Sequence, residues 1–311
     1  MSQLTTAQKK ITRTLIRHED VIARELIETY QAAVKDVRGL LAELYERYSI
    51  NGQLTLAEMT RYNRYLGMEK QIVELMRPHV HANNVLLNKL SSVQYEEQFY
   101  RTAWSFDNEL RTSLRWGQIP TDQVRAAVAH PLLELSQRDL GTATINRVRK
   151  AIAGGLVRGA SMPSMMKDIR TVMGTTTFDA MRIARTEAHR VRELGHIAAA
   201  ERSEEMGVKL KRVWDAQLDL ATRPSHAALD GVKADVGENF PGGPIAPGQW
   251  GIAGEDINCR CTVTDEIEDY EPETRRIRGE GVQPYKTFET WASEHGITGN
   301  KYGQKYNFVK G

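Results

Sequence analysis

The sequence predicts an α+β protein with a mostly helical, long-helix N-terminal half, a smaller α+β domain with a few short strands, and an extended C-terminal tail. Apolar residues recur at helical spacing through the first half of the chain. Two short later segments alternate apolar and polar residues, and a stretch rich in Gly and Pro separates them. We place the domains at 1–155, 156–268 and 269–311, the last as a partly ordered docking segment.

The first helix is expected over much of residues 5–48. Its mostly apolar positions follow spacings of four, three and four, and this repeat of about 3.67 residues per turn keeps the stripe nearly straight. We favour packing of the stripe on the protein's own domain over an intermolecular coiled coil. The positions are Ile11, Leu15, His18, Ile22, Leu26, Thr29, Ala33, Val37, Leu40, Leu44 and Tyr48.

Turn and capping residues divide the rest of the helical half. Asn51 and Gly52 predict a turn, and Thr55 offers the cap of a second helix that runs toward Pro78. Helical spacing resumes over 83–110, and Pro, Gly and Ser residues delimit shorter helices beyond it. These end near Gly154–Gly155 and near Gly174, and a longer helix follows over 179–204.

Strands are expected over 210–216 and 257–263, where the residues alternate, and 236–256 is expected to be a loop. A short helix should follow the first strand near Arg223.

Charge and hydropathy argue against a secreted protein, a membrane-spanning protein and a protein that binds DNA over its whole surface. The composition, 41% hydrophobic and 26% charged, suits a folded chain, and a net charge of +2 makes any DNA contact a local one. The N-terminus lacks the apolar region of a signal peptide, and no segment is apolar enough to span a membrane. We therefore expect synthesis in the cytoplasm.

The helix over 179–204 carries charge in an unusual place. Glu187 falls within its apolar sector, and a buried carboxylate requires a partner, for which Arg223 is the candidate. Beside it runs a basic stripe of Arg182, Arg185, His189, Arg192 and His196. The stripe is either a solvated face or a binding surface for anions, and we favour the solvated face.

Cys259 and Cys261 lie two residues apart on an expected strand, so both sulfurs should face the same side. With His226 they could supply three ligands of a structural zinc site, completed by Asp219, Asp230 or His189. The alternative is a pair of small residues that face a core, and a catalytic cysteine is less favoured because no adjacent base is identifiable.

An ordered set of short motifs spans roughly residues 150–265: Ala-Arg-Thr-Glu on a helix, Trp-Asp on a strand, His-x-x-Leu-Asp-Gly and Asn-Cys-Arg-Cys. In order and spacing this set resembles the phage Mu F-like minor head protein, or phage head morphogenesis, family. The resemblance transfers signature residues and no catalytic residue. They are Arg185, Glu187, Trp214, Asp215, Asp219, Arg223, His226, Asp230, Asn258, Cys259, Arg260 and Cys261.

The resemblance implies a minor capsid protein of a tailed phage, made in the host bacterial cytoplasm and located inside the head. It implies association with the portal protein and a role in capsid assembly, genome packaging or delivery. The major capsid or scaffold protein and non-specific DNA are further candidate partners. Two alternatives are kept: a zinc-dependent or nuclease-like enzyme that uses the same acidic residues, His226 and the cysteines, and a DNA-organising protein inside the capsid.

The tail alternates basic and aromatic residues, a composition found both in nucleic-acid contacts and in protein interfaces. We favour protein docking, with 288–292 as one helical turn. The residues are Arg275, Arg276, Arg278, Tyr285, Lys286, Phe288, Trp291, Lys301, Tyr302, Lys305, Tyr306, Phe308 and Lys310.

Overall fold

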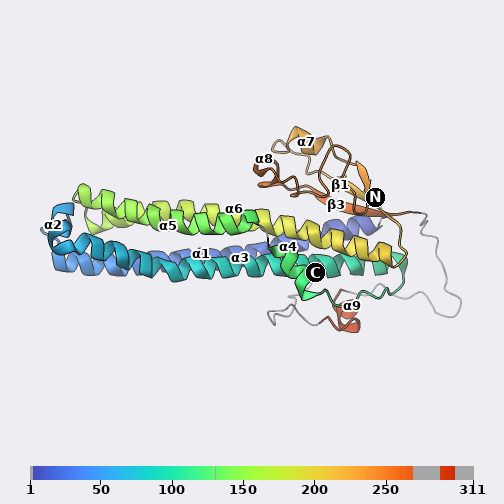
Figure 1. The fold of residues 1–311 in the computed structure, drawn as a ribbon, viewed down its shortest axis with the longest axis horizontal. Coiled ribbons are helices and arrows are strands. Elements are labelled where there is room, and N and C mark those ends of the chain that lie inside the picture. Colours follow the sequence, from blue (N-terminus) through green and yellow to red (C-terminus); the bar gives the residue numbers. More distant parts are fainter. Residues whose placement is uncertain (1–2, 130, 269–287, 298–311) are drawn as a thin grey trace. The chain divides into compact units, whose positions relative to one another are not determined.

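The computed structural model describes residues 3–129, 131–268 and 288–297 (Figure 1). It divides into two compact units. The helical unit comprises residues 20–88 and 130–184, and the mixed unit comprises residues 1–19, 89–129 and 185–311. The predicted α+β class, with long helices first and a small sheet later, is confirmed. The domain boundaries at 155/156 and 268/269 stay a prediction.

Four long helices supply most of the described residues: α1 (Gln3–Tyr48), α3 (Arg64–Leu110), α5 (Pro131–Val157) and α6 (Met162–Glu205). Short helical segments are α2 (Leu56–Thr60), η1 (Arg61–Asn63), α4 (Thr121–Val128), α7 (Pro224–Ala227), α8 (Ala253–Asp256) and α9 (Phe288–Glu294). The strands are β1 (Leu210–Asp215), β2 (Lys233–Asp235) and β3 (Thr262–Ile267).

The helical unit packs parts of all four long helices around one apolar core (Figure 1). From α1 it buries Leu26, Tyr30, Ala33, Val37, Leu41 and Leu44, a stripe at spacings of three and four residues. The stripe therefore packs on the protein's own core, as expected. Tyr30 and Leu41 are buried where the repeat had placed Thr29 and Leu40, so the stripe turns slightly around the helix.

Helices were predicted to break at three places where they continue. Pro78 lies inside α3 on an exposed position, where water can satisfy the carbonyl of Glu74 that proline leaves without a donor. Gly154 lies inside α5, which ends at Val157. Gly174 lies inside α6, because packing of the flanking turns in the core holds the helix.

The mixed unit contains an antiparallel sheet with the strand order β2-β1-β3. β1 confirms the first predicted strand, and its alternate residues Leu210, Arg212 and Trp214 are buried. The second predicted strand, 257–263, was placed too early: β3 begins at Thr262, because residues 257–261 form a turn and the approach to the strand. The sequence analysis missed β2, which is only three residues long.

Arg212 anchors the loop that was expected over 236–256. Its guanidinium, on a fully buried residue, donates to the carbonyls of Asp235 at 2.9 Å, Ile245 at 2.6 Å and Glu238. It also lies 5.2 Å from the ring of Phe240. One buried cation thus fixes a Gly- and Pro-rich segment that has little regular secondary structure of its own.

Side chains occupy the edge of β3 that faces away from β1. Glu193 on α6 accepts the amide of Val263 at 3.2 Å, and Gln8 on α1 accepts the amide of Asp265 at 2.8 Å. Gln8 also donates to the Asp265 carboxylate at 2.7 Å. Two outward-facing amides of this edge strand are therefore paired within the chain, which opposes the addition of another strand there.

The described part of the tail, residues 288–297, packs on the mixed unit of its own chain. α9 confirms the predicted helical turn, but its aromatics Phe288 and Trp291 are buried in the mixed unit, so they are not exposed anchors for a partner. Trp291 Nε1 donates to the Asp107 carboxylate at 2.7 Å. The other basic and aromatic tail residues lie outside the described residues.

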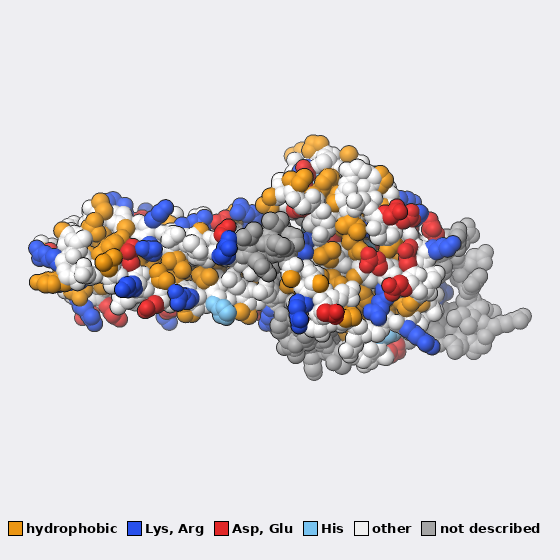
Figure 2. All heavy atoms as spheres, in the orientation of Figure 1, with side chains coloured by type: hydrophobic (Ala, Val, Ile, Leu, Met, Phe, Trp, Pro, Cys, Tyr) orange, Lys and Arg blue, Asp and Glu red, His pale blue; other side chains and the backbone are white. Residues whose placement is uncertain are grey.

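In the part of the chain that the structure describes, no helix combines the length and apolarity needed to cross a membrane. On the face drawn in Figure 2, exposed Lys and Arg side chains are spread along the helical unit and are mixed with apolar and acidic ones.

Candidate metal centre

His226, Cys259 and Cys261 converge in the mixed unit, and all three are buried. His226 Nδ1 lies 3.5 Å from Cys259 Sγ and 3.4 Å from Cys261 Sγ. The three ligand atoms lie within 4.8 Å of one another. The predicted proximity of His226 to both sulfurs, and the predicted common side of the two sulfurs, are confirmed.

The two cysteines stand between a turn and the start of β3. Cys259 and Cys261 precede β3, so the prediction that they lie on a strand is wrong. The amide of Cys259 donates to the carbonyl of Asp256 at 3.1 Å, and Asn258 between them has a φ of 57°. Asn tolerates this left-handed conformation better than most residues do, which explains the type of residue found here.

The pKa values of the two thiols are shifted in opposite directions. Hydrogen bonding to Cys259, and then to His226, lowers the pKa of Cys261 to about 6, against the opposing effect of burial. The same hydrogen bond to Cys261, together with burial, raises the pKa of Cys259. The site therefore favours a thiolate at Cys261, and a thiolate is the form that binds metals.

Signature residues hold the loop that follows β1 against the segment that precedes β3. Arg260 donates to both carboxylate oxygens of Asp219, at 2.5 and 2.7 Å. These hydrogen bonds, and then one from the amide of Ala221, lower the pKa of Asp219 to about 2. Arg223 Nη2 donates to the carbonyl of Ile257 at 2.7 Å.

Aromatic rings enclose the imidazole of His226. Trp214 on β1 meets it edge-on at 6.0 Å between ring centroids, and Trp250 stacks on it at 5.3 Å. The site thus brings together the signature residues Trp214, Asp219, Arg223, His226, Cys259, Arg260 and Cys261.

Glu187 is buried as predicted, but its partner is not Arg223. Arg190 on the next turn of α6 donates to Glu187 at 2.8 Å and also to the carbonyl of Ala127 at 3.1 Å. The pair is local because residues three apart lie on the same face of a helix. Of its neighbours in the motif, Arg185 is exposed, and Thr186 Oγ1 lies 3.5 Å from the amide of Asn258.

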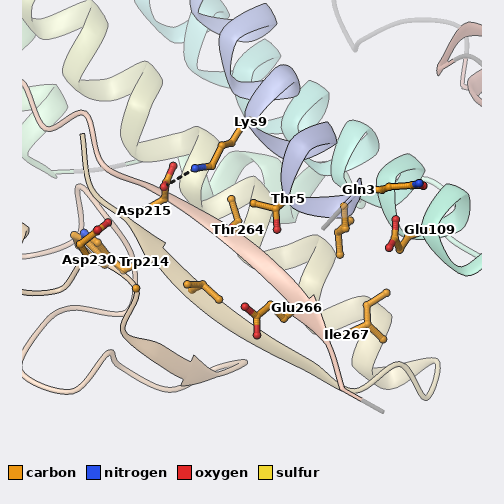
Figure 3. Close-up of a pocket in the computed structure, with 13 residues that line it drawn as sticks. Gln3, Thr5, Lys9, Glu109, Trp214, Asp215, Asp230, Thr264, Glu266 and Ile267 are labelled. Carbon is orange, nitrogen blue, oxygen red and sulfur yellow. Dashed lines mark hydrogen bonds and ion pairs between the residues drawn. The ribbon is translucent and has the colours of Figure 1, made fainter. Parts of the chain in front are cut away.

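Asp215 and Asp230 belong to a different place, a cavity of about 620 Å³ between the start of α1 and the sheet (Figure 3). There Lys9 of α1 reaches Asp215 at 2.7 Å. Asp230 accepts the amide of Ala216 at 2.9 Å and so closes the turn after β1. Neither carboxylate is in the group of possible metal ligands found among the described residues.

Part of the basic stripe on α6 is buried, so the interpretation as a solvated face is wrong there. Arg182 and Arg185 are exposed, whereas His189, Arg192 and His196 are buried. Arg192 pairs with Glu19, and His196 with Asp265 at 2.7 Å. Burial, and then the nearby His226, lower the pKa of His189 to about 4, which keeps this imidazole neutral at pH 7.

Glu255 is one of the residues at the site that the sequence analysis missed, together with Trp250 and Ser225. Glu255 Oε2 lies 3.0 Å from His226 Nε2 and accepts a hydrogen bond from Ser225 at 2.9 Å. A carboxylate four residues before Cys259 was the available signal, but nothing in the sequence showed that the loop returns to His226.

Comparisons with known proteins identify the family. Residues 146–264 match the family described as Phage Mu protein F like protein. Minor head protein GP7 of Bacillus phage SPP1 is 31% identical over 271 residues, which cover 82% of this chain and 85% of that protein. The chain belongs to the Mu F-like minor head protein family. The function of this Mu F-like protein is in phage head morphogenesis, at the virion capsid.

Two other relatives are longer than this Mu F-like chain. The NAD(+)--arginine ADP-ribosyltransferase EFV of Enterococcus faecalis is 26% identical in an alignment of 318 positions that covers 100% of the chain and 64% of that protein. An uncharacterised protein of Haemophilus influenzae is 29% identical over 163 residues, covering 52% of the chain and 34% of that protein. No solved structure matches the chain.

Proposed function

We propose that this chain is a minor head protein that binds the phage portal protein and is located inside the head, where it acts in assembly, genome packaging or delivery. The observation that carries the proposal is the extent of the similarity to the minor head protein of phage SPP1. That similarity covers 271 residues and so extends well beyond the matched family domain at 146–264. The helical part of the chain is therefore also related to a head protein.

An exposed apolar surface on the mixed unit supports docking on another capsid component. Leu218 and Leu220, in the loop after β1, are 64% and 108% exposed. Arg223 ties the same loop to Ile257, which is also exposed. Apolar side chains gather over α7 and α8 in Figure 2. Exposed apolar surface of this kind often marks a protein interface.

The alternative of an enzyme would use acidic residues for catalysis, but the pairing of these residues supports a structural role. Glu187 pairs with Arg190, Asp215 with Lys9, and Asp219 with Arg260. A hydrolytic site requires a carboxylate that is available to a metal or to water, whereas each of these three has a cation within ion-pair distance. For a DNA-organising role, the net charge of +2 and the mixed charges in Figure 2 offer only local support.

Co-purification from phage-producing cells tests the partner. Wild-type chain should recover portal protein as its dominant partner, and the double variant Leu218→Ser/Leu220→Ser should recover much less. Phe178→Ser, which changes an exposed apolar residue of the helical unit, is the matched control and should behave as wild type. Recovery of another capsid protein in place of portal would contradict the proposed partner, and unchanged recovery by the double variant would contradict the surface.

Protease treatment of virions tests the location. A protein inside the head should resist digestion in intact particles and become sensitive once the particles are opened. Digestion of the chain in intact virions would contradict the interior location.

A further inference from the structure

We propose that His226 Nδ1, Cys259 Sγ and Cys261 Sγ bind a structural zinc ion that fastens the loop after β1 to the segment before β3. The inference rests on the geometry of these three atoms and their surroundings, and it does not depend on portal binding. As zinc binds, both cysteines lose their thiol protons, and the neutral imidazole donates its Nδ1 lone pair to the ion.

The spacing of the ligand atoms fits a tetrahedral site. With bonds of about 2.3 Å to sulfur and about 2.0 Å to nitrogen, the tetrahedral angle separates a sulfur from a nitrogen by roughly 3.5 Å. The observed distances from Nδ1 to the two sulfurs are 3.5 and 3.4 Å. The two chain segments therefore already hold Nδ1 and the two sulfurs at distances that match two edges of a tetrahedron around zinc.

The environment of His226 supports this orientation of its ring. Nδ1 faces the two sulfurs, and the other ring nitrogen, which makes no hydrogen bond to the described residues, lies at an ion-pair distance of 3.0 Å from Glu255 Oε2. A carboxylate at the distal nitrogen of a ligand histidine is the usual arrangement at zinc sites, because it fixes the tautomer and raises the basicity of the ligating nitrogen. Ser225 donates to the same Glu255 oxygen and helps to hold it in place.

Backbone amides donate to both sulfurs, and the charge of a bound zinc ion would hold both as thiolates. The amide of Gln217 donates to Cys261, and the amide of Cys261 donates to Cys259. These bonds stabilise negative charge on sulfur. Two thiolates and an imidazole favour zinc over magnesium or calcium, which prefer oxygen ligands.

The apolar core around the cysteines is small, so a bound metal ion would help to stabilise it. The buried cluster comprises Trp214, Leu229, Ala234, Phe240, Cys259, Cys261 and Val263, so the proposed ligands themselves form part of it. Small apolar cores are commonly supplemented by a structural metal or by disulfides. Among the described residues the cysteines are free thiols, which leaves them available as ligands.

His189 is the candidate for the fourth ligand. Of the other two candidates, Asp219 is held by Arg260, and Asp230 accepts the amide of Ala216. His189 is buried, and its Nε2 has no hydrogen-bond partner among the residues that the structure describes. It does not belong to the group of close ligand atoms, so its side chain would have to move toward the sulfurs to bind.

The test uses the full-length chain, purified without a histidine tag from cells grown with zinc. Metal analysis should find about one equivalent of zinc in wild-type chain and in His81→Asn, a control at an exposed histidine of the helical unit. Cys259→Ser, Cys261→Ser and His226→Asn should each lose most of it. His189→Ala should bind more weakly, and unchanged affinity would overturn the assignment of this fourth ligand.

A measurement on the wild-type chain covers the case in which the variants fail to fold. A strong chelator should remove zinc, make both thiols reactive to a thiol reagent, and lower the melting temperature of the mixed unit. Cobalt added back should give the visible absorption of a tetrahedral thiolate site. Absence of zinc together with failure to bind added zinc or cobalt would overturn the proposal, as would zinc retained by the Cys259→Ser/Cys261→Ser double variant.

Discussion

Individual residues on α6 show how the mixed unit accommodates charge in its interior. Glu187 pairs with Arg190, Glu193 accepts the amide of Val263, and His196 pairs with Asp265. Each of these three groups has a partner, so the cost of removing it from water is offset in the folded chain. Helical periodicity correctly placed Glu187 inside, but it could not choose between a cation on the same helix and one on a distant loop.

Replacement of Glu187 by Ala should lower the free energy of unfolding of the mixed unit by about 3 kcal/mol, because it leaves the buried Arg190 guanidinium without its carboxylate. Arg223→Ala should cost only about 1 kcal/mol, since this side chain loses one hydrogen bond to a carbonyl. Urea denaturation followed by tryptophan fluorescence measures both. Equal losses would contradict the assignment of Arg190 as the principal partner.

Glu193 should make the mixed unit less stable as the pH rises. Burial raises the pKa of Glu193 to about 7, although His196, Arg192 and the amide of Val263 act in the opposite direction. A carboxyl whose pKa is higher in the folded chain binds its proton more tightly there, so its contribution is fully present below about pH 4.5 and is lost as the pH rises through 7.

The variant Glu193→Gln tests this dependence, because Gln keeps an oxygen for the amide of Val263 and does not ionise. It should resemble wild type at pH 5 and be more stable at pH 8, by up to about 3 kcal/mol. Denaturation at the two pH values gives the comparison. The interpretation fails if wild type is the more stable protein at pH 8.

The elements were predictable where local pattern determines them. The repeat in α1 and the alternation in β1 identified both elements, and the turn at Asn51 and Gly52 was found where expected. Helix ends were predicted less well, because tertiary packing carries α3 through Pro78 and α6 through Gly174. The predicted position of β3 was too early in the sequence, because alternation cannot distinguish a strand from the turn that leads into it.

The arrangement of the loop over 236–256 could not be predicted, since a single buried side chain far from it in sequence determines it. Arg212→Lys should lower the free energy of unfolding of the mixed unit by roughly 2–4 kcal/mol, because one ammonium cannot span carbonyls that the planar guanidinium reaches together. Hydrogen exchange should also accelerate in the loop. An unchanged exchange pattern would show that other contacts hold it.

At the scale of the whole molecule, the described residues form separate apolar cores, one in the helical unit and two in the mixed unit. The candidate site belongs entirely to the mixed unit, and the family motifs in the sequence contain most of its residues. The motifs could not show that their residues divide between two places. One group converges on the thiols, whereas Asp215 and Asp230 line a separate cavity.

Unfolding should therefore reveal more than one transition. All five tryptophans, at positions 104, 116, 214, 250 and 291, belong to the mixed unit, so their fluorescence reports that unit alone, whereas circular dichroism reports the helices of both.

Leu41→Ala removes a fully buried side chain from the core of the helical unit and should lower its free energy of unfolding by about 2–5 kcal/mol. It should shift the dichroism curve and leave the fluorescence midpoint unchanged, whereas Arg212→Lys should shift the fluorescence. If Leu41→Ala moves both midpoints equally, α1, α3 and α6, which contribute residues to both units, couple them into one cooperative structure.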